Sequence, residues 1–324
     1  MSIKSVLKKV TRHFPVLSGI ATYILGLYKP GSTGTGGTIS ARYCYSVWLR
    51  HLMMAYKNGL STQPDTVAEL GPGDSLGIGL AALLSGANNY YAFDVVKYAN
   101  TERNIAIFDE LVSLFQKREK IPDETEFPRV KPYLESYKFP AHILTDERLD
   151  KALKPERIES IRNAILHSGS RNRNNTQISY CVPWSDSKTV KEESVDMIYS
   201  QAVMEYVDDL AYTYQVLYRW LKPSGFMSHE IDFKSDGITK QWNGHLAYSD
   251  FVWRLIKGKK TMIPNRQPYS THINYIQKVG FEIVCSINTT DISGITREQL
   301  AARFKNMSND DLTTSSAFIQ AVKK

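Results

Sequence analysis

The chain has 324 residues, a length that fits one large domain or two small ones. Hydrophobic residues make up 42% of it and aromatic residues 11%, which is enough for a sizeable buried core and excludes a disordered chain. The formal net charge of +7 favours anionic partners, such as nucleic acid, a nucleotide sugar or a phospholipid surface, without selecting one.

The cysteines indicate a reducing compartment. Cys44, Cys181 and Cys285 lie far apart and form no C-x-x-C pair, so neither a disulfide framework nor a thiolate zinc site is expected. No apolar run reaches the ~20 residues that a membrane-spanning helix requires. The expected location is therefore the cytoplasm.

The first 28 residues combine an apolar helical face with basic residues. The apolar positions are Ile3, Val6, Leu7, Val10 and Phe14, and the basic ones are Lys4, Lys8, Lys9 and Arg12. This pattern fits a helix that caps the core, a helix that lies on the anionic inner face of the cytoplasmic membrane, or a secretory signal. No small-residue cleavage site follows, which argues against the signal.

A glycine-rich segment at 29–38 predicts a flexible linker, or alternatively a lid over a ligand. We therefore expect an N-terminal appendage over residues 1–60 and the main domain over 61–324.

Strand and helix signals alternate from residue 66 onward, after a helix expected over 41–56. The predicted strands are 66–70, 90–95, 177–182, 195–200, 226–232, 281–287 and 317–322. The predicted helices are 76–84, 105–115, 155–167, 209–221 and 297–305. This alternation predicts the α/β class, with a doubly wound, mostly parallel seven-stranded sheet closed by the last two strands. Inserts at about 100–176 and 234–267 interrupt the pattern and are expected to recognise a substrate.

The most informative stretch is V-A-E-L-G-P-G-D-S-L-G, a strand that runs into glycines and then a helix. Gly71 and Gly73 allow close approach of a ligand, and a helix N-terminus offers unpaired N–H groups. Leu76 replaces the third glycine of a dinucleotide fingerprint, and no P-loop lysine is present. Glu69 precedes the glycines, and Asp94 ends the next strand, where a carboxylate can bind a ribose diol.

This pattern resembles the acid-x-Gly-x-Gly motif of the class I S-adenosylmethionine-dependent methyltransferases. Four further elements that resemble the family follow in order: Val182–Trp184, Ser194–Ser200, Val203–Val207 and Leu221–Gly225. The resemblance implies a methyltransferase with a Rossmann-like fold and S-adenosylmethionine as cofactor. It implies that Glu69 and the glycine backbone hold the methionine end, and that Asp94 holds the ribose.

The remaining expected cofactor contacts are Asp74, Ser200 and Gln201. The family often has an acidic residue before the Leu-Pro-Phe element that contacts the adenine, and the stretch 177–181 has none. Ser179, Tyr180 or the backbone is therefore expected to contact the adenine. The family's frequent Leu-Glu-His histidine is Tyr206 here, which leaves the general base open.

A narrower resemblance concerns the acceptor. The elements that carry it are Met227–Asp232, Trp242–His245, Tyr248–Trp253 and Pro264–Arg266. They resemble methyltransferases encoded with bacterial surface-polysaccharide and glycan biosynthesis genes. This resemblance implies O-methylation of a sugar hydroxyl in a glycan, a glycolipid or a nucleotide sugar.

A sugar hydroxyl is a poor nucleophile at neutral pH, so its methylation requires a general base or a metal. His229 lies near the carboxyl end of strand 226–232, where ligands bind in open sheets, and is the proposed base, with Asp232 or Glu230 organising the site. A hydrogen-bonded structural histidine is the alternative. His245 is the reserve candidate. The spacing of His229, Asp232 and His245 fits no standard metal-ligand motif, so no metal is expected.

The predicted acceptor-binding residues are Tyr206, Trp242, Tyr248, Arg266 and His272. The tryptophan could instead be core, and Arg266 could form a surface salt bridge. Two other functions stay open. An RNA methyltransferase would explain the positive charge, although the charge lies in the N-terminal segment and in scattered lysines, which disfavours nucleic acid. A catalytically silent scaffold at a membrane surface would retain the fold without the reaction.

Overall fold

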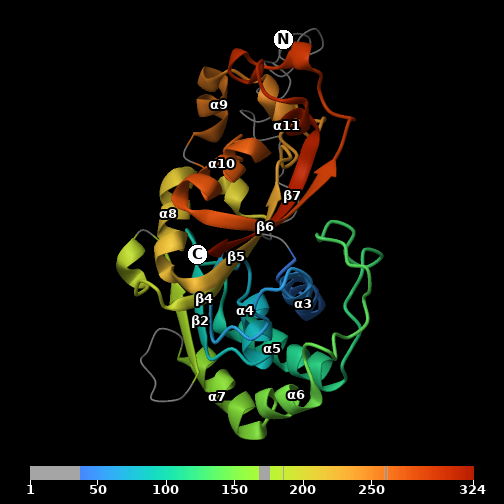
Figure 1. The fold of residues 1–324 in the computed structure, drawn as a ribbon, viewed down its shortest axis with the longest axis vertical. Helices are drawn as coiled ribbons and strands as arrows, with labels where there is room; N and C mark the ends of the chain where they lie inside the picture. Colours follow the sequence, from blue (N-terminus) through green and yellow to red (C-terminus); the bar gives the residue numbers. More distant parts are fainter. Residues whose placement is uncertain (1–36, 168–175, 185, 259, 261) are drawn as a thin grey trace, which may run out of the picture.

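The computed structural model describes residues 37–167, 176–184, 186–258, 260 and 262–324, which form an α/β structure around one sheet (Figure 1). The expected N-terminal helix and almost all of the expected linker lie outside these residues. The strands are β1 Thr66–Leu70, β2 Asn89–Phe93, β3 Gln177–Cys181, β4 Val195–Gln201, β5 Leu221–Asp232, β6 Phe281–Thr290 and β7 Thr314–Lys323. The longer helices are α3 Ala41–Lys57, α4 Gly77–Leu84, α5 Thr101–Gln116, α6 Asp146–Ala152, α7 Pro155–Leu166, α8 Leu210–Trp220, α9 Asp250–Lys257 and α10 Tyr269–Val279.

The seven described strands are ordered β3-β2-β1-β4-β5-β7-β6. β7 runs antiparallel to its neighbours β5 and β6, and the other pairs are parallel. This order places the switch point between β1 and β4, where a doubly wound sheet binds its ligand. The predicted fold class, a Rossmann-like methyltransferase fold with a mostly parallel seven-stranded sheet, is confirmed.

A buried apolar cluster covers each face of the sheet. One cluster joins α3, α4, α5 and α7 to side chains such as Tyr90 and Tyr199. The other joins α8 and α10 to side chains such as Ile198 and Met227. Both faces of the central strands are therefore buried, and only the ends of the strands remain available for a ligand.

Helix α3 corrects the expected boundary near residue 60. Its side chains Tyr45, Trp48 and Leu49 are fully buried and belong to the same cluster as α4 and α5. The Trp48 indole donates a hydrogen bond to Ser85 Oγ, 2.9 Å away. The folded domain therefore includes α3 instead of beginning at residue 61.

The two expected inserts differ in character. The stretch 100–176 contains α5, whose apolar side packs into the core, so this helix is part of the sheet's cover and not an addition. The helix expected over 297–305 is wrong: two 3₁₀ turns, Arg297–Gln299 and Ala302–Phe304, replace it. Between them Leu300 is extended, because the following N–H, of Ala301, donates to Leu246 O at 3.0 Å.

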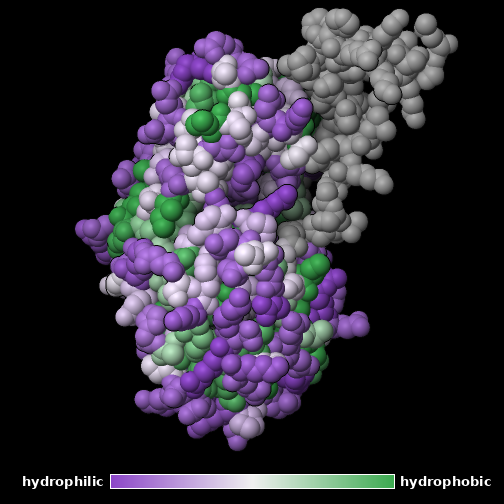
Figure 2. All heavy atoms as spheres, turned by 90° about the vertical axis from the view of Figure 1, so that its right-hand side faces the viewer, coloured by the Kyte–Doolittle hydropathy of each residue, from purple (hydrophilic) through white to green (hydrophobic). Residues whose placement is uncertain are grey.

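Within the described part of the chain, no helix is long and apolar enough to cross a membrane. The described residues visible in Figure 2 are mainly hydrophilic, and hydrophobic side chains lie among them in separate small groups.

Candidate cofactor and acceptor site

A cavity of about 430 Å³ opens at the carboxyl ends of β1, β2 and β4. We call it the cofactor cavity. It is lined by Leu70, Gly71, Gly73, Phe93, Asp94, Val95, Tyr98, Trp184, Gln201, Ala202, Val203, Tyr206, Val207, Asp208 and Met262. Its position is the switch point that the sheet order defines.

The glycine loop forms one wall of the cofactor cavity. Gly71 and Gly73 have φ angles of +63° and +71°, a backbone conformation that favours glycine. The Gly71 N–H donates to Phe93 O at 2.8 Å, which fixes the loop against the end of β2. A Cβ atom on Gly71 would lie 2.6 Å from a Val203 methyl carbon, so the space beside this backbone exists because the side chain is absent.

Asp94 sits at the end of β2 with its carboxylate facing the glycine loop. Its Oδ2 accepts from Gly73 N at 3.4 Å, and its Oδ1 accepts from Val95 N at 2.7 Å. Burial raises its pKa, and these backbone N–H groups oppose that rise by stabilising the charged form. A carboxylate held this way retains lone pairs for a ribose diol.

The acceptor side of the cofactor cavity is formed by the end of β4. Gln201 lines the cavity, and its Nε2 donates to Glu230 Oε2 at 3.3 Å. Glu230 is buried on β5, and burial raises its pKa to about 8, with the nearby Asp232 contributing in the same direction. A carboxyl group with a pKa near neutrality is suited to accept a proton.

Glu69 does not line the cofactor cavity. It is buried on β1, where it accepts hydrogen bonds from the Tyr90 hydroxyl and from the Tyr199 hydroxyl, the latter at 3.1 Å. Burial raises its pKa to about 7. β1 turns this side chain into the core under α4 and away from the cavity lining, so the geometry does not support the expected contact of Glu69 with the methionine end.

Four other expected cofactor contacts also lie outside the cavity. Asp74 is not among the lining residues, and its main-chain carbonyl accepts from Arg103 Nη1 at 2.9 Å. Ser179 and Tyr180 lie within β3, not at the cavity, and Ser200 is fully buried against His229. Gly71, Gly73, Asp94 and Gln201 are the expected cofactor residues that do line the cavity.

His229 faces the core between β5 and α8. Its Nδ1 lies 2.8 Å from Ser200 Oγ, and its ring meets the edge of Tyr214. Burial lowers its pKa to about 3, with smaller contributions from His51 and His272. The assignment of His229 as general base is therefore not supported, because the side chain has no access to the cofactor cavity, and the alternative of a structural histidine describes it.

His272, expected at the acceptor, is likewise buried, 2.9 Å from the Tyr214 hydroxyl. Tyr248 is buried and stacks on Trp253 at a centroid distance of 6.2 Å, so it supports the second insert instead of contacting a ligand. Tyr206 does line the cofactor cavity.

The other predicted acceptor residues lie around a second, smaller cavity at the end of β5, which we call the polar pocket. It is lined by Glu205, Asp232, Phe233, Trp242, His245, Leu246, Pro264, Asn265, Arg266, Gln267, Pro268, Met307, Asp311 and Thr314. The structure thus brings Asp232 and His245, which were predicted to be catalytic, to one cavity with Trp242 and Arg266, which were predicted to bind the acceptor; both roles stay predictions. Asp232 forms an ion pair with Lys234 at 3.0 Å.

The sequence analysis missed several lining residues of the cofactor cavity. Tyr98 follows β2, Asp208 follows the 3₁₀ turn Met204–Tyr206, and Met262 comes from the second insert. The Tyr98 hydroxyl lies 3.5 Å from Met262 Sδ, which closes the cavity on one side. No local pattern could place Met262 there, because it lies about 190 residues after the glycine loop in the sequence.

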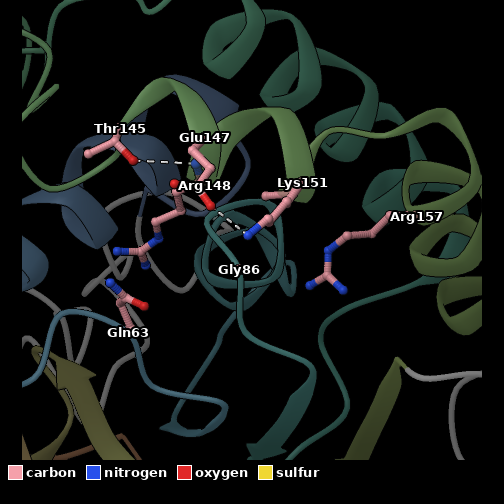
Figure 3. A pocket seen from close by; sticks show the side chains of 8 residues that line it. Gln63, Gly86, Thr145, Glu147, Arg148, Lys151 and Arg157 are labelled. Carbon is pink, nitrogen blue, oxygen red and sulfur yellow. Dashed lines mark hydrogen bonds and ion pairs between the residues drawn. The ribbon is translucent and has the colours of Figure 1, made fainter.

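A third cavity, of about 370 Å³, lies at the opposite edge of the sheet beside α6 and α7 (Figure 3). Its arginines are engaged by the backbone: Arg148 donates to Ser85 O and Thr62 O, and Arg157 donates to Leu83 O. These contacts hold the helices in place. Among the residues that the model describes, no cluster of three histidine, cysteine or acidic side chains could hold a metal ion.

Comparison with known proteins agrees with this geometry. A family model described as a methyltransferase domain matches residues 161–228, from α7 to β5. No curated protein matches the chain.

Three solved structures illustrate the structural likeness. An S-adenosylmethionine-dependent methyltransferase from Mesorhizobium loti has 14% identity and a TM-score of 0.39, over 84% of this chain and 97% of its own. One from Methanosarcina mazei has 11% identity and a TM-score of 0.41, over 83% and 96%. A phosphoethanolamine N-methyltransferase from Haemonchus contortus in complex with S-adenosyl-L-methionine has 14% identity and a TM-score of 0.41, over 85% and 52%.

The sheet order and the glycine-lined cavity are those expected of an S-adenosylmethionine-dependent methyltransferase, and the methyltransferase family match over residues 161–228 supports the same class. The cofactor of that class supplies a methyl group on a sulfonium centre. The residues fit such a group, because Gly71 and Gly73 present backbone without side chains to the cavity and Asp94 provides a carboxylate beside it.

Proposed function

We propose that the protein O-methylates a hydroxyl group of a carbohydrate, in a glycan, a glycolipid or a nucleotide sugar. The observation that carries this proposal is that Gln201 lines the cofactor cavity and donates a hydrogen bond to the buried carboxyl of Glu230, which lies directly behind the lining. Methyl transfer is an in-line displacement, so the protein chiefly has to orient the acceptor and remove its proton. Gln201 orients the hydroxyl, and Glu230 accepts the proton.

The charges around the two cavities favour a neutral, hydroxyl-rich acceptor. No lysine or arginine is found among the described residues that line the cofactor cavity. Arg266 is the basic residue of the polar pocket, and Asp250 neutralises it at 2.6 Å. Nucleic-acid acceptors are bound chiefly through lysine and arginine contacts to phosphates, so this lining argues against the RNA alternative.

The experiment is a transfer assay with radiolabelled S-adenosylmethionine and three acceptor groups: a panel of methyl glycosides and oligosaccharides, a panel of nucleotide sugars, and total RNA. The expected result is label in a carbohydrate acceptor and none in RNA. The Gly71→Ala variant, which is expected to bind S-adenosylmethionine at least tenfold more weakly, serves as the low-activity control at subsaturating cofactor. Label in RNA, with none in any carbohydrate, would overturn the proposal. In the producing cells, deletion of the gene should remove one methyl group from a glycan detected by mass spectrometry.

A further inference from the structure

The polar pocket contains buried polar atoms that no described residue satisfies. These atoms are Glu205 Oε2, Trp242 Nε1, His245 Nδ1 and Arg266 Nε. All four residues line this one cavity, and Glu205, His245 and Arg266 are each at least 96% buried, with exposed fractions of 4%, 2% and 4%. A buried polar atom without a hydrogen-bond partner is unfavourable, so four of them around one small space point to an occupant that pairs with them.

The arginine cannot turn away to satisfy itself. Its Nη1 donates to Tyr248 O at 2.6 Å, and its Nη2 donates to Asp250 Oδ1 at 2.6 Å. Its guanidinium also lies against the rings of Trp253 and Phe304, at 4.8 and 5.2 Å from their centroids. These contacts fix the plane of the group, and therefore the direction in which the remaining Nε–H points.

The donors and acceptors define the chemistry of the occupant. The Arg266 Nε–H and the Trp242 Nε1–H can only donate, so the occupant must accept two hydrogen bonds. The pocket has a volume of about 20 Å³, which fits a single water-sized group. A hydroxyl oxygen meets both conditions, because it accepts two hydrogen bonds and donates its own hydrogen to the carboxyl oxygen of Glu205.

The surrounding charges exclude an anionic group. Asp232 and Asp311 line the polar pocket together with Glu205, and Asp250 already matches the charge of Arg266. A carboxylate or a phosphate in the pocket would therefore face several carboxyl groups, with no free cation among the described residues that line the pocket. A neutral hydroxyl group experiences no such electrostatic repulsion.

The polar pocket shares a wall with the cofactor cavity. That wall is the 3₁₀ turn Met204–Tyr206, from which Glu205 faces the polar pocket and Tyr206 faces the cofactor cavity. Asn265 fixes the turn: its N–H donates to Glu205 O at 2.6 Å, and its Nδ2 donates to Met204 O at 2.9 Å. An acceptor that reaches the methyl donor across this turn can also place a second group in the polar pocket.

We propose that the polar pocket binds a second hydroxyl group of the acceptor, so that the enzyme requires an acceptor with at least two hydroxyls. This inference rests on the proposed function and adds the pocket that selects a polyol over a simple alcohol. Trp242 and Arg266 donate to that hydroxyl and Glu205 accepts its hydrogen, while His245 lines the pocket beside them.

The experiment follows the indole N–H signals of the five tryptophans by ¹⁵N NMR, with Trp242→Phe used to assign the signal of Trp242. The probes are the methyl glycosides of glucose, galactose and mannose, their monodeoxy analogues, 1-propanol and acetate, each added to the S-adenosylhomocysteine-saturated protein. The expected result is a saturable shift of the Trp242 signal with a glycoside and none with 1-propanol or acetate. One deoxy analogue should bind about tenfold more weakly, because it lacks the hydroxyl in the pocket.

Two signals serve as controls. The Trp220 signal should not move with any glycoside, since its Nε1 donates to Ser187 O at 2.8 Å in the core. The Trp184 signal, from the cofactor cavity, should move when S-adenosylhomocysteine is added. A Trp184 response without a Trp242 response to any glycoside would overturn the polar-pocket inference alone. An equal Trp242 response to acetate would also overturn it, and the absence of carbohydrate methylation in the transfer assay is the separate result that overturns the proposed function.

Discussion

Gly71 and Val203 are in contact across the cofactor cavity: a Cβ atom on Gly71 would lie 2.6 Å from Val203 Cγ2 and 2.9 Å from Cγ1. The glycine begins the loop after β1, and the valine follows β4, so the contact joins the two strands on either side of the switch point. The width of the cavity at this point therefore depends on the missing side chain.

We expect Gly71→Ala to weaken S-adenosylmethionine binding at least tenfold, because the methyl group meets Val203 and the φ of +63° is disfavoured for alanine. Titration calorimetry measures the affinity. Gly59→Ala is the matched control: its φ is +69°, but nothing lies within 4 Å of the added Cβ. The control carries the same backbone penalty and should bind as the wild type does. Equal affinity in all three proteins would contradict the role of the loop.

Asp94→Asn should also weaken binding of S-adenosylmethionine, by about 10- to 100-fold. The amide keeps the shape of the side chain but removes the charge that strengthens a hydrogen bond to a hydroxyl, a contribution of about 1.5–3 kcal/mol. Asp196→Asn is the control at the amino ends of β1 and β4, where its carboxylate accepts from Thr66 N at 2.8 Å. That variant should lose some stability and keep its affinity. Normal affinity in Asp94→Asn would show that this carboxylate does not hold the ribose.

The sequence predicted the strands closely, because short β-rich runs bounded by glycine, proline and polar residues mark a buried parallel sheet. β1 was predicted at its observed bounds, Thr66–Leu70, and the other six strands were located with differences confined mainly to their ends. The helix expected at 297–305 failed because a contact to Leu246, about fifty residues away in the sequence, sets the backbone there.

The site was harder to predict for a physical reason. β1 is buried on both faces, so its pattern of hydrophobic residues does not indicate which side chains point toward a ligand. Glu69 points to Tyr90, whose ring occupies the space left by Gly79, where a Cβ atom would lie 2.0 Å from the ring. β5 is likewise buried on both faces beyond Gly225. Its pattern of hydrophobic residues therefore does not indicate that the His229 side chain faces the core and not the cofactor cavity.

Glu230→Gln should lower kcat by about 10²–10⁴-fold while leaving S-adenosylmethionine affinity unchanged, because the amide cannot take a proton. The pKa of Glu230 is raised to about 8, so the fraction of active carboxylate rises with pH. The kcat/KM of the wild type should therefore increase about tenfold per pH unit below pH 8 and level off above it. The variant should lose this dependence. A variant with near-normal kcat and an unchanged pH profile would exclude Glu230 as the base.

The last prediction concerns the buried histidine of β5. The pKa of His229 is lowered to about 3 from an ordinary value of 6.5, so the folded protein binds fewer protons than the unfolded chain between these two values. Stability contributed by the neutral ring is complete above pH 6.5 and is lost as the pH falls toward 3, at about 1.4 kcal/mol per pH unit.

Glu69 and Glu230 have raised pKa values and act in the opposite direction, since they favour the folded state as the pH falls from 8 toward 4.5. The test therefore compares the free energy of unfolding of the wild type with that of a variant that lacks the histidine. His229→Asn can keep a hydrogen bond to Ser200 but has no group that titrates, and urea unfolding of both proteins is measured from pH 7.5 to 4.5. The stability advantage of the wild type over the variant should be constant above pH 6.5 and shrink below it by about 1.4 kcal/mol per unit. The same variant should retain methyl transfer, because the ring lies outside the cofactor cavity. Two results would contradict this placement of His229. One is a difference in the free energy of unfolding that does not change with pH, and the other is a variant that folds and binds S-adenosylmethionine but no longer transfers the methyl group.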